Sequence, residues 1–122
     1  MMSIREAITA LSCENVLECF FGLNEFDILI YRTLLKLGGA RIEQLAETIE
    51  KSENTIYKSL QKLMLCGLVF REKKTIEAGG YYYIYMPVEP ERVAEKMRKM
   101  LGELCKRVDT AINEFVTEFR EV

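Results

Sequence analysis

The sequence predicts a mainly α fold with one small β-hairpin, an α+β arrangement, and three observations lead to it. Apolar residues recur at helical spacing in separate short stretches before position 66. Two short runs rich in aromatic and β-branched residues then flank a Gly-Gly pair, which is typical of a hairpin. The last 30 or so residues keep a helical spacing without a break. Compact helices followed by a hairpin form the winged helix-turn-helix plan.

The N-terminal part predicts two separate helical regions. Residues 1–21 read as a helical segment of one or two pieces, which Gly22 interrupts. Asn24 is a preferred capping residue for the helix that follows. Its first turn carries Glu25 and Asp27, the charge sign that a helix N-terminus favours. We therefore expect both acidic residues to stabilise the start of this helix.

A short helix comes next. Gly38 and Gly39 end the preceding helix, and residues 40–42 are expected to form an extended link. The stretch IEQLAETIEKS then predicts a helix of about two turns with Leu45 and Ile49 facing inward.

The helix predicted over 53–65 has an apolar back and a polar front. Ser52 is a preferred N-cap, and Gly67 lies just past the C-terminal end. At 100° per residue, Ile56, Leu60 and Leu63 cluster on the back, although Leu65 leans outward. The front is formed by Asn54, Thr55, Lys58, Gln61 and Lys62.

The hairpin consists of the strands LVFREKK and YYYIYM around TIEAGG. Arg71, Lys73 and Lys74 stand on the strand that leads to its tip. Alternation places Tyr81, Tyr83 and Tyr85 on one face, and we favour packing on the helices over base stacking for one of the two faces.

The C-terminal segment, residues 89–122, predicts one helix of about 30 residues, roughly 45 Å long. Pro90 suits its first turn. An apolar stripe of this length exceeds what one small domain can bury, so we expect a homodimer, with packing on the N-terminal helix of the same chain as the alternative for part of it. The stripe comprises Met97, Leu101, Leu104, Val108, Ala111, Ile112, Phe115 and Phe119.

Positive charge is concentrated around the 53–65 helix. The chain has 122 residues and a net charge of −2. Residues 51–75 hold six Lys/Arg and two Glu, whereas residues 1–50 hold four Lys/Arg and eight Asp/Glu. We expect one domain over 1–122, with the winged helix over 22–88. A basic block in an acidic chain favours contact with an anionic partner at this block.

The composition argues against an enzyme and against a metal site. The chain has no histidine, the commonest general base. Its cysteines, Cys13, Cys19, Cys66 and Cys105, form no C-x-x-C pair. We therefore predict no catalysis, no metal and no cofactor. The thiols are expected to be small buried hydrophobes, with redox sensing by Cys19 or Cys66 as the alternative. Neither a membrane span nor a signal peptide is apparent, so a cytoplasmic location without membrane partners is expected.

The polar front suits double-stranded DNA. Asn and Gln can pair with adenine, Lys can reach guanine or phosphate, and a basic wing over 71–80 can contact the flanking backbone. Two alternatives stay open: a solvated polar face, and a winged helix used as a protein–protein module or adaptor subunit. The predicted DNA-binding residues are Ser52, Asn54, Thr55, Tyr57, Lys58, Gln61, Lys62, Arg71, Lys73 and Lys74.

Residues 22–98 resemble the DNA-binding domain of the TrmB-type transcriptional regulators common in archaea, and more loosely the MarR group. The resemblance is carried by Ser52, by Thr55-Ile56-Tyr57-Lys58, by Leu60 and Leu63, and by Gly67-Leu68-Val69. The stretch GGYYYIYMPVEPERV is also similar to that family's wing. The resemblance implies a winged-helix transcriptional regulator that binds DNA.

Three features depart from the family pattern. Lys58 stands where arginine is common, which keeps the charge but loses a bidentate donor. Glu53 favours the helix dipole but repels phosphate. Full-sized family members carry a C-terminal sugar-binding domain for which 122 residues leave no room, so the resemblance implies no sugar sensing here.

Overall fold

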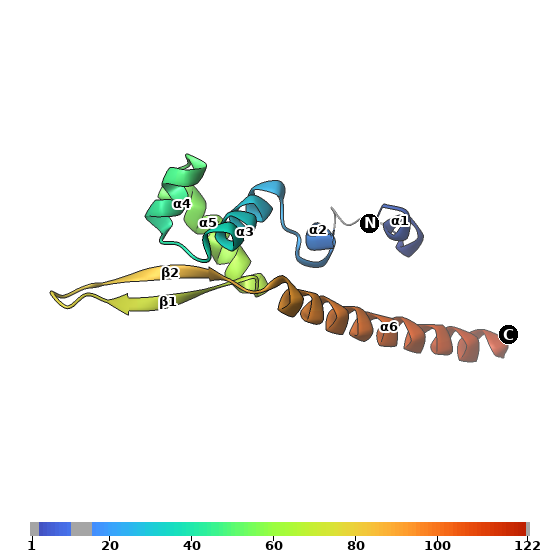
Figure 1. The fold of residues 1–122 in the computed structure, drawn as a ribbon. Coiled ribbons are helices and arrows are strands. Elements are labelled where there is room, and N and C mark those ends of the chain that lie inside the picture. Colours follow the sequence, from blue (N-terminus) through green and yellow to red (C-terminus); the bar gives the residue numbers. More distant parts are fainter. Residues whose placement is uncertain (1–2, 11–15, 122) are drawn as a thin grey trace. The chain divides into compact units, whose positions relative to one another are not determined.

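The computed structural model describes residues 3–10 and 16–121 (Figure 1). The chain divides after Glu89 into two compact units, of which the second is a single helix. The mainly α fold with a hairpin is confirmed. Its elements are α1 Ile4–Ala10, α2 Val16–Phe21, α3 Glu25–Leu37, α4 Ile42–Ile49, α5 Glu53–Cys66, β1 Val69–Thr75, β2 Tyr81–Pro87 and α6 Pro90–Arg120.

Local capping residues set the bounds of α3. The side chain of Asn24 accepts a hydrogen bond from the backbone N–H of Asp27, and the Asp27 carboxylate accepts one from the N–H of Asn24. This reciprocal pair is a capping box, which satisfies two backbone donors at once. Gly38 ends α3 in the left-handed region at φ 74°, as its position in the sequence predicts.

Helices α4 and α5 form the helix-turn-helix. Glu50 ends α4 with a φ of 61°, an uncommon conformation for a residue other than glycine. The chain then turns through Lys51 to Ser52, whose Oγ accepts a hydrogen bond from the N–H of Thr55. Gly67 ends α5 at φ 80° and donates its N–H to Leu63 and Met64. The predicted cap and stop of this helix are confirmed.

The core lies where α3, α4, α5 and the hairpin meet. Its largest fully buried side chains are Leu23, Ile30, Leu34, Leu45, Ile56, Leu60, Leu63 and Leu68. The predicted apolar back of α5 is therefore confirmed, because Ile56, Leu60 and Leu63 all belong to this set. Tyr31 adds a polar tie, since its hydroxyl donates to the backbone oxygen of Val88, 2.7 Å away.

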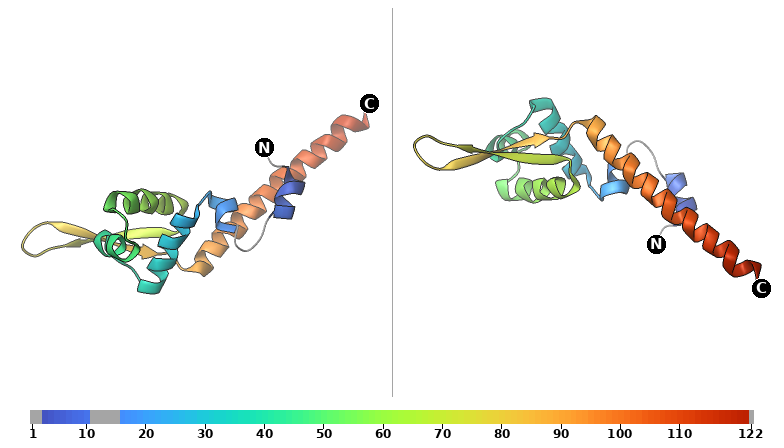
Figure 2. Two further views of the ribbon diagram at one scale, coloured as in Figure 1. Left: turned by 90° about the horizontal axis from the view of Figure 1, so that it is seen from above. Right: turned by 90° about the horizontal axis from the view of Figure 1, so that it is seen from below.

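Strands β1 and β2 pair antiparallel, with Arg71 opposite Tyr85 and Thr75 opposite Tyr81. The reversal is closed by the N–H of Ile76, which donates to the oxygen of Gly80. Ala40 exchanges two backbone hydrogen bonds with Tyr85 and so anchors the hairpin base to the link before α4. Figure 2 shows the hairpin extending well past α3, α4 and α5.

The expected burial of the thiols is wrong at two positions. Cys19 on α2 and Cys105 on α6 are exposed, and Cys66 is half-buried with its Sγ 3.8 Å from the oxygen of Phe21. Cys13 lies outside the described residues. The error has a simple cause: the expectation rested on composition alone, which does not show that α2 and α6 leave these two thiols exposed in the single chain.

Candidate nucleic-acid interface

The outward face of α5 is polar along most of its length. Asn54, Thr55, Lys58 and Gln61 are all exposed, while the opposite side of the helix is buried in the core. Leu65 continues this face and is 88% exposed, in line with its outward position in the sequence pattern. The structure therefore brings amide, hydroxyl and ammonium groups onto one accessible helix face.

The first turn of α5 is held in a fixed geometry. The Ser52 hydroxyl donates to the Oγ1 of Thr55, 2.9 Å away, while its oxygen accepts from the backbone N–H of Thr55. Both side chains are exposed. The N-terminus of this helix therefore combines a positive dipole end with two hydroxyl groups, an arrangement that suits a phosphate.

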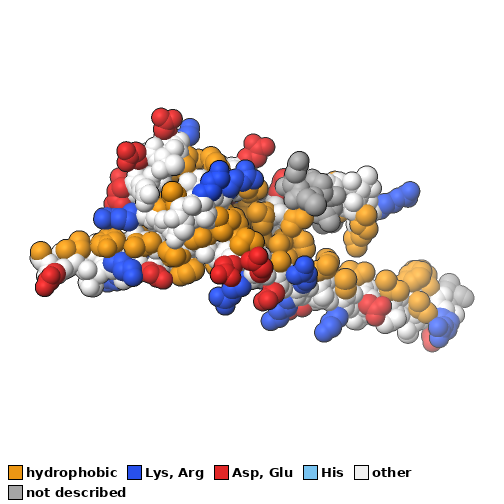
Figure 3. Space-filling view, viewed as in Figure 1, with side chains coloured by type: hydrophobic (Ala, Val, Ile, Leu, Met, Phe, Trp, Pro, Cys, Tyr) orange, Lys and Arg blue, Asp and Glu red, His pale blue; other side chains and the backbone are white. Residues whose placement is uncertain are grey.

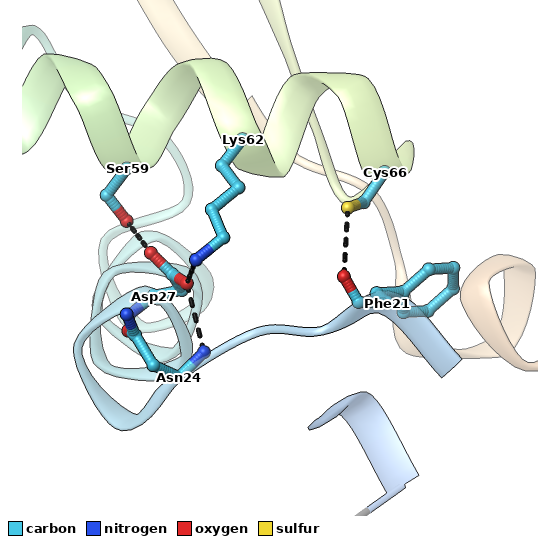
Figure 4. A network of polar contacts seen from close by, with 6 residues as sticks. All are labelled: Phe21, Asn24, Asp27, Ser59, Lys62 and Cys66. Atoms are coloured by element: carbon cyan, nitrogen blue, oxygen red, sulfur yellow. Dashed lines mark hydrogen bonds and ion pairs between the residues drawn. The ribbon is translucent and has the colours of Figure 1, made fainter. Parts of the chain in front are cut away.

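Lys62 follows Lys58 by one helical turn, but its ammonium group is paired with a carboxylate of α3. Its Nζ lies 2.6 Å from Oδ2 of Asp27 on α3 (Figure 4). The same carboxylate accepts a hydrogen bond from the hydroxyl of Ser59, also at 2.6 Å. Lys62 is thus engaged in an intramolecular ion pair, which lowers its value as a DNA contact.

Asp27 is a residue that sequence reasoning assigned too small a role. Its side chain is only 3% exposed, and it joins α3 to α5 besides closing the capping box. Burial raises the pKa of this carboxyl, but hydrogen bonds from Lys62, Ser59 and Asn24 outweigh it, so its pKa lies below 3.8. This network fixes the orientation of α5 against α3.

We expect Asp27→Asn to destabilise the fold by about 1–3 kcal/mol, because it removes the buried charged partner of an ion pair whose lysine is partly exposed. Ser59→Ala removes only one hydrogen bond and should cost about 1 kcal/mol. Because the native pKa is lowered, this stabilisation is present above about pH 4 and is lost as the pH falls through the native pKa. Urea unfolding of the three proteins at pH 7 and pH 3 measures this. Equal losses for both variants would contradict the network.

The hairpin carries ordered pairs of a cation and an aromatic ring. The guanidinium of Arg71 lies 4.0 Å from the ring centre of Tyr83, and the ammonium of Lys73 lies 4.2 Å from that of Tyr81. Both are diagonal cross-strand neighbours in the observed register. Such cation–π contacts contribute about 0.5–1 kcal/mol each at exposed sites. They hold Arg71 and Lys73 on one face of the wing.

That face of the hairpin adjoins α5. Hydrogen bonding to Tyr85 and, to a smaller extent, to Tyr57 of α5 raises the pKa of Arg71, so this guanidinium stays positively charged. Lys74 alternates to the other face, where its Nζ lies 3.4 Å from Oε2 of Glu72. The two wing lysines therefore do not act as one patch.

One further cation near the wing escaped the sequence pattern. Arg41, just before α4, lies with its guanidinium 4.2 Å from the ring centre of Tyr82. Its Nε is also 3.4 Å from Oε2 of Glu43. The contact between Arg41 and Tyr82 arises because the neighbouring residue, Ala40, pairs with Tyr85 of β2, and the sequence pattern does not show this pairing. The carboxylate of Glu43 weakens the electrostatic attraction between Arg41 and an anion.

Within residues 3–10 and 16–121, no helix is both long and apolar enough to cross a bilayer. The described part of the chain also brings no three metal-ligating side chains together.

Comparison with known proteins agrees with this geometry. Residues 17–91 match the family model described as "Sugar-specific transcriptional regulator TrmB". The chain is 30% identical over 119 residues to the uncharacterized protein MJ1503 of Methanocaldococcus jannaschii, covering 98% of this chain and 89% of that protein. It is 33% identical over 98 residues to the HTH-type sugar sensing transcriptional regulator TrmBL1 of Pyrococcus furiosus. That match covers 80% of this chain but 27% of the relative.

A solved structure gives the same fold. A possible transcriptional regulator from Methanosarcina mazei superposes with a TM-score of 0.72, covering 85% of this chain and 88% of that one at 20% identity. The likeness extends the winged-helix architecture to a protein of distant sequence. From the family match and the exposed helix face beside a basic wing, this chain belongs to the TrmB family of transcriptional regulators.

Proposed function

We propose that this TrmB-family regulator binds double-stranded DNA in a sequence-specific manner as a homodimer, with α5 in the major groove and the hairpin against the flanking backbone. One observation carries the proposal: β1, which holds Arg71 and Lys73 over the rings of Tyr83 and Tyr81, packs against α5, whose outward face is polar and exposed. A recognition helix with a basic wing beside it is the docking arrangement of this fold class.

The side chains on α5 divide the task between bases and phosphates. Asn54 and Gln61 can each form two hydrogen bonds with an adenine, whereas Lys58 reaches guanine acceptors or a phosphate. Ser52 and Thr55 lie at the helix N-terminus, where backbone amides and hydroxyls suit a phosphate. Tyr57 is half-buried and serves mainly to connect α5 with Arg71.

Two of the predicted DNA-binding cations have carboxylate partners within the chain, so we propose a smaller set of DNA contacts. Lys62 is paired with Asp27, and Lys74 lies on the other face of β1 near Glu72. The cations that remain beside the polar face of α5 are Lys58, Arg71 and Lys73. Two subunits then supply six positive contacts.

The second subunit follows from the limited size of one reading head. A single short helix contacts too few bases to be selective, whereas two heads about 34 Å apart can recognise a palindrome. Helix α6 supplies a surface for pairing, since Leu101, Leu104 and Phe115 are about half exposed in the single chain. The predicted stripe from Met97 to Phe119 is therefore the proposed dimer contact.

We expect Lys58→Ala to weaken binding to a selected operator by about 1–3 kcal/mol if Lys58 contacts a base. Lys58→Arg keeps the charge and should restore much of the affinity for random DNA. Fluorescence anisotropy with operator and random duplexes measures both. The proposal fails if the wild type binds no duplex at low salt.

The two wing lysines provide a matched pair of variants. Lys73→Ala should weaken operator and random DNA alike and lower the salt slope by about one per subunit. Lys74→Ala should leave both nearly unchanged, because this side chain lies on the opposite face beside Glu72. Binding titrations at several salt concentrations compare them. The reverse order of effects would show that the wing docks by its other face.

A further inference from the structure

The apolar stripe of α6 is symmetric about its own middle. Leu101 and Phe115 each lie seven residues from Val108, one before it and one after it. Leu104 and Ile112 each lie four residues from Val108 in the same way. Met97 and Phe119 are eleven residues away on either side. The stripe therefore presents nearly the same spacing when it is followed in either direction.

This stripe is open in the single chain. Leu101, Leu104, Ile112 and Phe115 have exposed fractions of 49%, 56%, 53% and 58%. Figure 3 shows hydrophobic side chains gathered along one side of α6, with charged side chains along the other. An apolar seam of this length is a protein–protein contact in most proteins.

The charge on α6 is divided between its halves. Residues 90–107 carry six Lys/Arg and three Glu, whereas residues 108–120 carry one Arg and three Asp/Glu. Two parallel copies would place the basic halves side by side. Two antiparallel copies place each basic half against an acidic half, which lowers the electrostatic energy of the pair.

We propose that two copies of α6 pair antiparallel about a two-fold axis near Val108. The inference rests on the proposed homodimer and specifies its geometry. Each winged helix joins α6 at Pro90, so the two junctions leave from opposite ends of the pair. At 1.5 Å per residue they are roughly 54 Å apart.

Cross-linking at single cysteines distinguishes the two directions. In a background with Cys13, Cys19, Cys66 and Cys105 changed to serine, Val108→Cys should cross-link to itself with a short bismaleimide. Leu101→Cys alone should not, because the two sites would be roughly 21 Å apart in the antiparallel pair. A refolded mixture of Leu101→Cys and Phe115→Cys should give the mixed product, identified by its mass.

Self-cross-linking of Leu101→Cys without a mixed product would overturn the antiparallel arrangement. A wild type that is dimeric by light scattering, with no cross-link at position 108, would overturn the α6 seam but leave the homodimer intact. A monomeric wild type would remove the proposed homodimer itself. These outcomes separate failure of this inference from failure of the proposed function.

Discussion

The affinity of the dimer for its operator is expected to fall roughly a thousandfold between 50 and 200 mM salt. Lys58, Arg71 and Lys73 of each subunit each bring one positive charge to the DNA in the proposed complex, which displaces counterions from about six phosphates per dimer. Release of the condensed counterions then gives a steep linear dependence of log affinity on log salt concentration. Anisotropy titrations over this range measure the slope directly.

The variants of the wing and of α5 identify the source of this slope. Lys58→Ala combined with Lys73→Ala removes four phosphate contacts per dimer and should reduce the slope by roughly four. Lys74→Ala is the control of equal charge for Lys73→Ala alone, and it should keep the wild-type slope. A slope that responds to Lys74 and not to Lys73 would contradict the proposed docking face. A flat salt dependence in the wild type would contradict phosphate contact altogether.

The second large effect concerns the α6 stripe. Leu104→Glu together with Val108→Glu places four carboxylates in the two-fold seam. Burying unpaired charges there should cost several kcal/mol, so the variant should be monomeric at micromolar concentration. Operator binding should be lost with the dimer, because a single head contacts too few bases. Sedimentation velocity and anisotropy on the same samples measure both quantities.

A matched variant separates charge from position in this test. Thr110→Glu with Asn113→Glu adds the same number of carboxylates to exposed positions of α6 away from the stripe. This control should stay dimeric. If the Leu104→Glu/Val108→Glu variant also stays dimeric, the contact lies elsewhere, and α2 with Phe20 and Phe21 becomes the next surface to test.

The elements that the sequence predicted well are those with local signals. Ser52 and Gly67 mark the ends of α5 because an N-cap hydroxyl and a left-handed glycine act within one turn of the helix. Asn24 and Gly38 do the same for α3. The core stripe of α5 also follows from helical spacing alone.

The role of Asp27 could not be predicted in this way. Its first function, the capping box with Asn24, spans three residues and is visible in the sequence. Its second function joins it to Ser59 and Lys62, which lie 32 and 35 residues further along the chain. That contact depends on how α3 packs against α5, so the local pattern could not show that the ammonium group of Lys62 is paired with Asp27.

The contacts of the wing residues could not be predicted from the sequence pattern either. In a β-strand, alternation puts Lys73 and Lys74 on opposite faces. Which of the two lysines lies on the face toward α5 depends on the contacts that the hairpin makes in the fold. Arg71 lies near Tyr57 of α5 and over Tyr83, and those partners follow from the register of the hairpin. The register is closed by the turn between Ile76 and Gly80, whose exact hydrogen bonds the sequence does not specify.

The central claim is that this chain recognises specific sites in duplex DNA, and genomic footprinting of the tagged protein in its own cells tests it most directly. We predict strong, discrete peaks upstream of genes that share a palindromic sequence, and their loss with Lys58→Ala. The wild-type and Lys58→Ala proteins must be present at equal levels for this comparison. A wild-type profile without discrete peaks, from a protein that is folded and abundant, would contradict the account.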